Sequence, residues 1–311
     1  MFRPKSRPLR QEHYRWMRDG MPNFNDRMFE HIRELEVIAK KDVNWISPTS
    51  PVIRAIEIMS SHHRSLIVLS SGLFRGLLTA MSVVNYLGGG ELFRIVVDRY
   101  NYNIYNALIK EPVENIMERN PVIIYIDEGI REALTRMVVY GAGILPILQR
   151  DGKVYGILTE HDLVKYLSGV ASLGLKVVDV MSSPVVTVDD KSTLKKAMES
   201  MIKFGFRRLP VVDNERVVTG LITALDIVRA FGAHSIIEKA RGGDVREIVQ
   251  TPVSEVMIRD LAVVHPEDDL AEAVNAMLSR DISSVLVVDE DGILNGIITE
   301  RDILYAILAP K

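Results

Sequence analysis

The stretch GILTEHDLVKYL, from Gly156 to Leu167, joins a short apolar strand to a helix. Thr159 ends the apolar part, and Asp162 follows three residues later, where helical patterning begins. A threonine with a carboxylate three residues on is a capping-box pattern, in which each side chain bonds a backbone N–H of the other residue. Such a cap stabilises a helix by about 1 kcal/mol. A single copy would therefore indicate helix capping and nothing more.

The same junction recurs three more times along the chain. The copies are GLLTAMSVVNYL (Gly76–Leu87), GLITALDIVRAF (Gly220–Phe231) and GIITERDILYAI (Gly296–Ile307). Opening motifs precede three of the four copies: VENIM (Val113–Met117), VVDVM (Val177–Met181) and VSEVM (Val253–Met257). The register is also kept, because Gly156 and Gly220 are 64 residues apart, as are Ala133 and Ala197 of the alanine-centred helices. We infer four sequence repeats.

Each repeat is expected to form strand, helix, strand, hairpin turn, strand and helix. Valine and isoleucine fill the predicted strands, which favours β-structure. The predicted two-residue turns are Asp151-Gly152, Asp213-Asn214 and Asp291-Gly292. A small sheet covered on one face by two helices cannot bury its other face alone, so we expect the repeats to pack in pairs, first with second and third with fourth. The longer inserts after the first and third repeats have helical patterning.

Composition narrows the class of protein. The 311 residues carry a net charge of −3, are 47% hydrophobic and include no cysteine, which excludes disulfides and thiolate metal sites. His161 and His234 have no companions at metal-ligand spacing, so no metal is expected, and Met137, Met201 and Met277 lie on apolar helical faces expected in the core. The apolar stretch 65–90 contains Arg75, so a buried fold is favoured over a membrane span. Without a recognisable signal peptide, we expect a cytoplasmic protein.

Residues 1–41 differ in character from the repeats. They hold ten Lys/Arg against six Asp/Glu, a net charge of +4, with aromatic residues interspersed. One interpretation is a helical arm that docks on the core. A second is a contact with nucleic acid or another partner, because a local basic patch with aromatic residues is the expected footprint. A third is a disordered segment.

The repeated junction also permits a functional interpretation. N–H groups and the dipole at a helix start attract anions such as phosphate, and a hydroxyl there can donate to a phosphate oxygen. A carboxylate one turn later can accept hydrogen bonds from a vicinal diol such as ribose. The candidate residues are Thr159, Thr223 and Thr299 for phosphate and Asp162, Asp226 and Asp302 for ribose. Apolar strand edges such as Leu209-Pro210 would provide a slot for a flat base.

The repeated V-x-x-[IV]-M opening motif, the R-x-L-P-V-V-D strand and the G-[IL]-[IL]-T-x-x-D-[IL] junction resemble the cystathionine-β-synthase (CBS) domain. The resemblance covers roughly residues 42–309, and the layout is similar to that of the gamma subunits of AMP-activated protein kinase and of archaeal four-repeat proteins. It implies an α/β (α+β) fold of four tandem CBS repeats, each with a small three-stranded sheet and two helices, paired into two pseudo-twofold modules. The boundaries we expect are 1–41 for the arm and 42–100, 101–170, 171–235 and 236–311 for the repeats.

The resemblance further implies an adenosine-containing ligand (AMP, ADP, ATP or S-adenosylmethionine) and no required cofactor. Carried over residue by residue, it implies that Asp302 and Thr299 face Arg207 and Arg208, that Asp162 and Thr159 face His63 and Arg64, that Asp226 and Thr223 face Ser283 and Ser284, and that Leu209, Pro210, Thr187 and Val188 line a base pocket. The first repeat departs from the pattern, because Ser82 replaces the aspartate. That cleft is expected to be empty or structural.

We therefore expect a ligand-sensing regulatory protein that controls a protein partner, and not an enzyme, because no nucleophile–base pairing or paired catalytic carboxylates stand out. The alternatives are a structural scaffold whose Thr-x-x-Asp pairs only cap helices, a nucleic-acid-binding regulator using the basic arm, and, more remotely, a nucleotide-hydrolysing enzyme. A homodimer is possible. The sequence leaves the ligand, the partner and the oligomeric state open.

Overall fold

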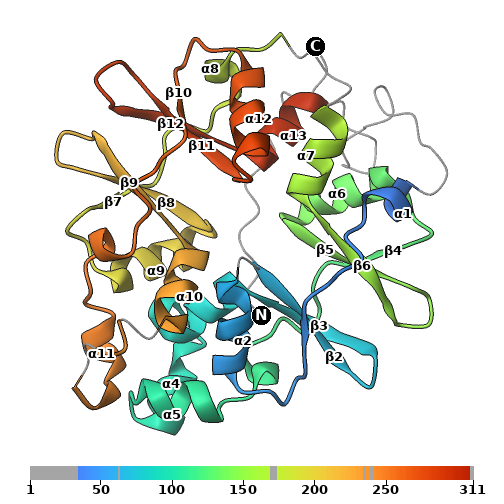
Figure 1. Cartoon of the computed structure of the whole chain (residues 1–311), viewed down its shortest axis with the longest axis vertical. Helices are drawn as coiled ribbons and strands as arrows, with labels where there is room; N and C mark the ends of the chain where they lie inside the picture. The colour runs from blue at the N-terminus through green and yellow to red at the C-terminus, as the bar shows by residue number, and fades with distance from the viewer. Residues whose placement is uncertain (1–33, 62–63, 169–173, 234–235, 239–240, 309–311) are drawn as a thin grey trace. The chain divides into compact units, whose positions relative to one another are not determined.

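The computed structural model of the protein describes residues 34–61, 64–168, 174–233, 236–238 and 241–308 (Figure 1). Residues 1–33 of the N-terminal arm lie outside the described residues, as do His63 and His234. The interpretations of the arm, and the role expected of His63, therefore stay predictions.

Each repeat forms a three-stranded sheet with two helices, in the order strand, helix, strand, strand, helix. Repeat 1 contains β1 (Trp45–Ile46), α2 (Val52–Ser60), β2 (Ser65–Ser70), β3 (Leu73–Thr79) and α3 (Ala80–Val84), and repeat 2 contains β4 (Ile124–Tyr125), α6 (Ile130–Tyr140), β5 (Ile144–Leu148), β6 (Val154–Thr159) and α7 (Glu160–Ser168). Repeat 3 contains β7 (Val188–Asp189), α9 (Leu194–Phe204), β8 (Arg208–Val212), β9 (Val218–Thr223) and α10 (Ala224–Gly232), and repeat 4 contains β10 (Val263–Val264), α12 (Leu270–Ser279), β11 (Ser284–Val288), β12 (Leu294–Thr299) and α13 (Glu300–Leu308). In each sheet the first two strands are parallel and the last two antiparallel. The predicted order of elements and the α/β class are confirmed.

The hairpin turns differ from the two-residue turns that the sequence predicted. In repeat 2, Gln149 N–H donates to the carbonyl of Lys153 at 2.8 Å, so three residues form the loop and the last of them, Gly152, has φ of 85°. Repeats 3 and 4 have the same three-residue loop, with Arg216 and Gly292 in the left-handed position. A third loop residue with positive φ is the next commonest way to close a hairpin. The Asp-Asn pair of repeat 3 therefore does not supply the left-handed residue.

The inserts between repeats contain the short helices that their patterning indicated. These are α4 (Phe93–Tyr100) and α5 (Ile104–Lys110) after repeat 1, and α11 (Val245–Ile248) after repeat 3. Glu111, which follows α5, is fully buried and connects parts of the first insert. Its carboxylate accepts hydrogen bonds from Arg99 at 2.9 Å, Tyr100 at 2.8 Å and Asn115 at 2.6 Å. A buried carboxylate requires such partners, because an unpaired one costs far more than it contributes.

The described chain divides into two compact units, each of which draws on two repeats. Unit 1 consists of residues 43–121 and 186–260, and unit 2 of residues 34–42, 122–185 and 261–308, apart from the gaps given above. The hydrophobic core of unit 1 is thus shared by repeats 1 and 3, and that of unit 2 by repeats 2 and 4. The sequence indicated which helix faces are apolar, but it led us to expect repeat 1 with 2 and repeat 3 with 4. Repeats 1 and 2 are linked instead by β-bridges between an opening segment and a last strand, and so are repeats 3 and 4.

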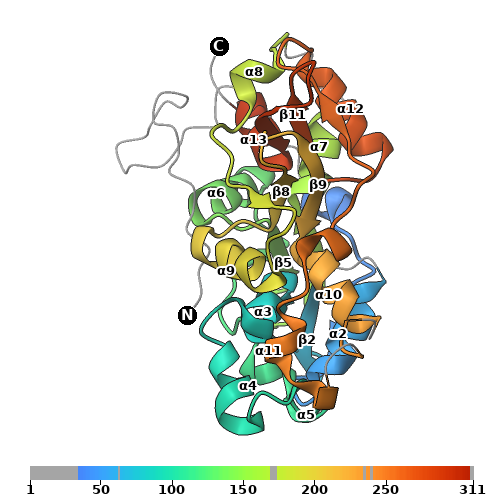
Figure 2. The ribbon, with the colours of Figure 1, turned by 90° about the vertical axis from the view of Figure 1, so that its left-hand side faces the viewer.

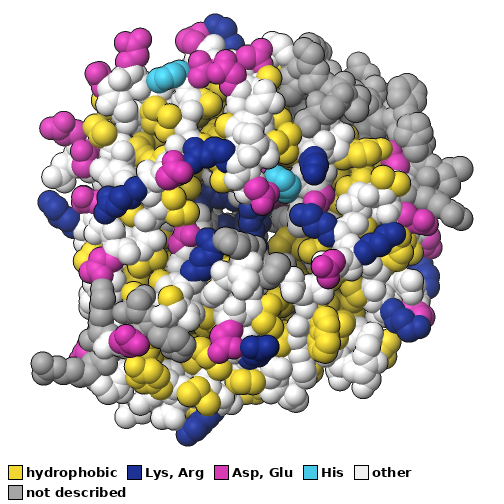
Figure 3. Space-filling model, viewed as in Figure 1, with side chains coloured by type: hydrophobic (Ala, Val, Ile, Leu, Met, Phe, Trp, Pro, Cys, Tyr) yellow, Lys and Arg dark blue, Asp and Glu magenta, His cyan; other side chains and the backbone are white. Residues whose placement is uncertain are grey.

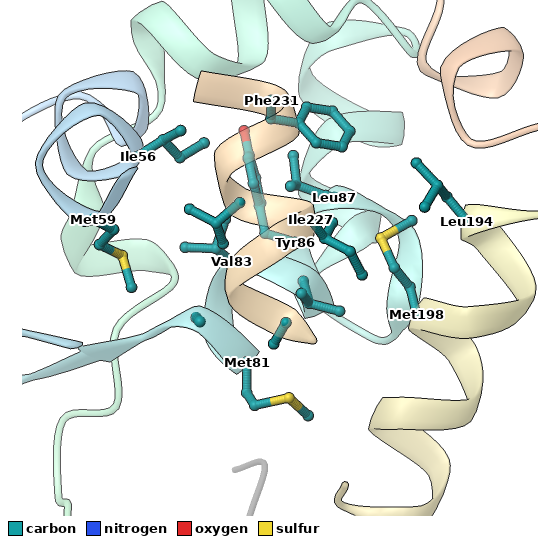
Figure 4. Packing of buried hydrophobic residues seen from close by; sticks show 14 of the residues in the cluster. Ile56, Met59, Met81, Val83, Tyr86, Leu87, Leu194, Met198, Ile227 and Phe231 are labelled. Carbon is teal, nitrogen blue, oxygen red and sulfur yellow. The ribbon is translucent and has the colours of Figure 1, made fainter. Parts of the chain in front are cut away.

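Helices of different repeats form the core of unit 1. Helix α10 lies beside α2, as the two ribbon views agree (Figures 1 and 2). Between the helices of this unit, Phe231 and Ile227 of α10 pack with Tyr86 and Met198, all fully buried (Figure 4). The predicted repeat alanines and the predicted core methionines are fully or almost fully buried in their units: Ala55, Ala133, Ala197, Ala273, Met137, Met201 and Met277.

The surface carries charges of both signs. On the face drawn in Figure 3, lysine and arginine side chains lie at several separate places with acidic side chains among them. Among the described residues, no helix is both long and apolar enough to cross a membrane. In the same part of the chain, no group of three or more histidine, cysteine, aspartate or glutamate side chains could hold a metal ion.

Shortening Phe231 to alanine should destabilise unit 1 by about 3–5 kcal/mol, because the cavity left among fully buried neighbours cannot refill. Phe204→Ala is the matched control, because Phe204 ends α9 with 39% of its surface exposed and should cost on the order of 1 kcal/mol. Urea unfolding followed by circular dichroism measures both losses. Equal losses in the two variants would contradict the shared core.

Candidate functional site

The three Thr-x-x-Asp junctions form the same hydrogen-bonded structure. Each threonine N–H donates to Oδ2 of its aspartate at 2.9 Å, and each threonine hydroxyl donates to the same oxygen at 2.5–2.6 Å. In return, each aspartate N–H donates to the threonine Oγ1 at 3.3–3.4 Å. The capping interpretation is thus confirmed for Thr159/Asp162, Thr223/Asp226 and Thr299/Asp302. Because Oδ2 is fully engaged in the cap, the direction of Oδ1 is fixed in all three copies.

Repeat 1 keeps the cap without a carboxylate. Ser82 N–H donates to Thr79 Oγ1 at 3.1 Å, and the two hydroxyls lie 3.0 Å apart. A serine can close the box but offers no negative charge for a diol. This agrees with the expectation that repeat 1 departs from the others.

A segment before the first strand of each repeat pairs with the last strand of another repeat, which the sequence did not reveal. For repeats 2 to 4 this opening segment begins with the opening motif, and for repeat 1 it is the end of the arm, including Lys40. Isolated β-bridges join Lys40 to Ile157, Glu118 to Leu77, Ser182 to Ile297 and Ile258 to Leu221. Repeats 1 and 2 therefore exchange their opening segments, and so do repeats 3 and 4. Each bridge lies within one unit, because the opening segment belongs to the unit of the strand that it joins.

This exchange explains the glycine that begins every junction. A Cβ atom on Gly156 would lie 2.6 Å from the carbonyl oxygen of Lys40, and one on Gly76 would lie 2.4 Å from that of Glu118. On Gly220 and Gly296, a Cβ atom would lie 2.4 and 2.5 Å from Sδ of a methionine in the exchanged segment. Only a residue without a Cβ atom allows the exchanged segment and the last strand to approach each other this closely.

The exchanged segments place different side chains beside the second carboxylate oxygen. Lys40 Nζ lies 3.0 Å from Asp162 Oδ1, and the Ser182 hydroxyl donates to Asp302 Oδ1 at 2.5 Å. The corresponding residue in repeat 4 is Ile258, whose side chain has no polar atom, and Arg229 Nη1 lies 3.6 Å from Asp226 Oδ1. Burial raises the pKa of Asp226, and the threonine bonds oppose that rise. The three aspartates thus share one cap but have three different surroundings.

The predicted phosphate-binding residues lie beside the threonine of their own repeat. Arg208 begins β8 directly opposite Thr223, and Ser284 begins β11 opposite Thr299. The carbonyl of Arg64 accepts a hydrogen bond at 3.0 Å from the N–H of Ala80, the residue after Thr79. The carbonyl of Arg207 accepts from Ala224 N–H at 2.9 Å, and that of Ser283 accepts from Glu300 N–H at 3.4 Å. In each case the aspartate expected to face these residues belongs to the other unit. It therefore stays a prediction that Asp302 faces Arg207 and Arg208, that Asp162 faces Arg64, and that Asp226 faces Ser283 and Ser284.

The residues expected to contact a base are largely buried. Leu209 and Val188 belong to the hydrophobic core of unit 1. Pro210 is also buried, and Thr187 is partly exposed just before β7. Their assignment to a base pocket stays a prediction.

In unit 2, the first turns of α7 and α13 are joined by two crossed side-chain contacts, an arginine–glutamate ion pair and a histidine–glutamate contact. Glu160 of α7 accepts from Arg301 Nε of α13 at 2.6 Å, and Glu300 of α13 contacts His161 Nδ1 of α7 at 2.9 Å. Both glutamates are almost fully buried. His161 Nε2 also lies 3.5 Å from Asp281. The contact with Glu300 raises the pKa of His161, while burial and Lys40 oppose the rise.

The stability that His161 contributes to the fold should therefore depend on pH. A raised folded-state pKa stabilises the fold fully below the unfolded value of about 6.5, and this contribution is lost as the pH rises through the folded pKa. We expect His161→Gln to lower the melting temperature more at about pH 6 than at about pH 9.

Thermal unfolding of the two proteins across this pH range measures the difference. His265→Gln is the control in the same unit, because the ring of His265 contacts the carbonyl of Val288. A loss for His161→Gln that is the same at every pH would show that the Glu300 contact is not an ion pair.

The family model for the CBS domain matches residues 32–89, 113–169, 177–233 and 253–309 of the chain. Protein MJ1225 of Methanocaldococcus jannaschii is 30% identical over 276 residues, which cover 88% of this chain and 98% of the relative. Its crystal structure, described as that of a proposed archaeal homologue of γ-AMPK, matches with a TM-score of 0.83 at 29% identity, over 88% of this chain and 99% of that chain.

Two further proteins are similar over most of the chain. A 33.4 kDa protein in the ribosomal RNA operon of Thermofilum pendens is 30% identical over 233 residues, covering 75% of this chain and 76% of the relative. The crystal structure of a conserved protein from Pyrococcus horikoshii matches with a TM-score of 0.55 at 19% identity, over 88% of this chain and 99% of that one, which is a likeness of fold alone.

Proposed function

Because the chain belongs to the CBS domain family, we propose that it is a regulatory protein that binds an adenosine-containing ligand at the helix starts of Asp162, Asp226 and Asp302. The observation that carries the proposal is the fixed carboxylate: one oxygen is held by the threonine, so the other keeps one direction in three separate copies. A carboxylate held in this way is preorganised to accept hydrogen bonds from the two hydroxyls of a ribose.

The site of Asp302 is the best supported of the three. Its neighbour Ser182 is a hydroxyl that can donate to the carboxylate and accept from a ligand hydroxyl, whereas the ammonium group of Lys40 beside Asp162 can only donate. The resemblance to the family assigns Arg207 and Arg208 to the phosphate of this ligand, and arginine is well suited to bind phosphate through two parallel bonds. AMP, ADP, ATP and S-adenosylmethionine all remain candidates.

The regulatory mechanism would be a population shift. A ligand that contacts two repeats favours the conformation in which those repeats are held together, and a protein partner that recognises this conformation responds to the ligand concentration. No enzymatic step is required of the chain.

Asp302→Asn tests the assignment without removing the cap, because the amide oxygen of asparagine can still accept from Thr299. We expect affinity at this site to fall at least about tenfold, since each hydrogen bond to a charged group contributes about 1.5–3 kcal/mol. Isothermal titration of the full chain with AMP, ATP and S-adenosylmethionine measures it. Arg208→Ala should weaken the two nucleotides in the same assay.

The matched control is Asp269→Asn, because Asp269 also caps a helix of repeat 4, accepting from Ala271 N–H at 2.8 Å. This variant should bind as the wild type does. Wild-type affinity in both Asp302→Asn and Arg208→Ala would remove the assignment.

A structural scaffold is the second candidate, and the observed caps favour it. In that case Asp302→Ala would lower the melting temperature, and none of the three ligands would bind the wild-type chain.

A further inference from the structure

The crossed side-chain contacts of unit 2 connect two of the proposed ligand sites. We call Glu160, His161, Glu300 and Arg301 the helix-start ion cluster. In each helix, the first residue supplies a carboxylate to the other helix and the second residue supplies a side-chain nitrogen, from His161 in α7 and from Arg301 in α13. The third residue of each helix is the aspartate of a proposed site, Asp162 or Asp302. The cluster therefore lies in the same helical turn as both aspartates.

Further bonds hold the cluster in place. Arg301 Nη2 donates to the carbonyl of Gly141 at 2.9 Å, where helix α6 ends. The exposed fraction of the Arg301 side chain is 22%, against 2% for Glu160, so this pair is largely removed from water. Breaking a buried pair leaves an uncompensated charge, which is strongly unfavourable. A displacement of one helix start is therefore expected to displace the other.

Unit 1 has no such cluster at the same positions. The residues after the junction threonines are Ala80 and Met81 in repeat 1 and Ala224 and Leu225 in repeat 3. Ala80, Met81 and Ala224 are buried in the apolar core. Apolar side chains can slide against one another without breaking a directional bond. Unit 1 also has only one of the three aspartates, Asp226, because repeat 1 has Ser82.

Resting on the proposed function, we propose that the helix-start ion cluster couples the sites of Asp162 and Asp302, so that a ligand at one site changes the affinity of the other. Such coupling is reciprocal and typically changes affinity by a factor of about 5–150. The site of Asp226 should bind independently of Asp162. The four cluster residues are positioning residues that need not contact the ligand.

The test uses the full chain carrying Asp226→Asn, which leaves two of the three sites. Adding Asp162→Asn or Asp302→Asn isolates one site and gives its intrinsic affinity for AMP by isothermal titration. If the sites are independent, these two values predict the titration of the two-site protein. We expect the two-site titration to depart from this prediction by about fivefold or more in the affinity of the second binding step.

Replacing the cluster by the residues of unit 1 should abolish this departure. The variant is Glu160→Ala, His161→Met, Glu300→Ala and Arg301→Leu, which leaves no buried charge unpaired, and such replacements are often neutral for stability. We expect its two sites to bind AMP independently with their intrinsic affinities retained. Should this variant not fold, His161→Gln with Glu300→Gln replaces the crossed histidine–glutamate contact by a neutral hydrogen bond and should reduce the coupling.

Three outcomes are distinguishable. Independent sites in the parent protein would overturn the coupling while leaving ligand binding intact. The same coupling with and without the cluster would place its origin elsewhere and would also overturn the proposal. Absence of binding of AMP, ATP and S-adenosylmethionine to the wild-type chain would instead overturn the proposed function, and the coupling with it.

Discussion

A carboxylate buried in the first turn of a helix is the constraint from which the arrangement of each junction follows. Asp162, Asp226 and Asp302 have less than a tenth of their surface exposed, and a charge so placed needs compensating donors. The threonine amide, the threonine hydroxyl and the helix dipole provide them. Threonine must therefore end the strand, and the aspartate must stand three residues later. The cap uses Oδ2, so the second carboxylate oxygen, Oδ1, can contact groups from other parts of the fold.

The exchanged opening segment of another repeat lies beside each junction. Because a glycine opens each junction, that segment passes close enough for its side chain to reach the carboxylate. Lysine, serine and isoleucine occupy this place in the three junctions that have an aspartate. The same repeated motif therefore has a different chemical environment in each copy, and the difference comes from outside the motif.

Local features of the fold could be predicted from the sequence, and long-range ones could not. The order of elements, the caps and the burial of Ala133 or Met201 follow from patterns within a dozen residues. The three-residue hairpin loops required knowledge of which residue takes positive φ, and Arg216 does so without being glycine or asparagine. The sharing of a core between repeats 1 and 3, and the pairing of Glu160 with Arg301, join residues more than a hundred positions apart. No periodicity indicates such partners. The residues assigned from family resemblance to opposite sides of a cleft remain predictions for the same reason.

The composition of the two units has a consequence for how the chain folds during synthesis. Neither unit is a continuous stretch: each needs segments from both halves of the sequence. A nascent chain that has emerged only as far as repeat 2 holds one half of each core, with α2 and α7 lacking α10 and α13, the helices that pack against them in the complete fold. Incomplete cores of this kind are prone to aggregation and to pairing between separate molecules. Folding of this protein should therefore be completed largely after translation, and its halves should not behave as independent domains.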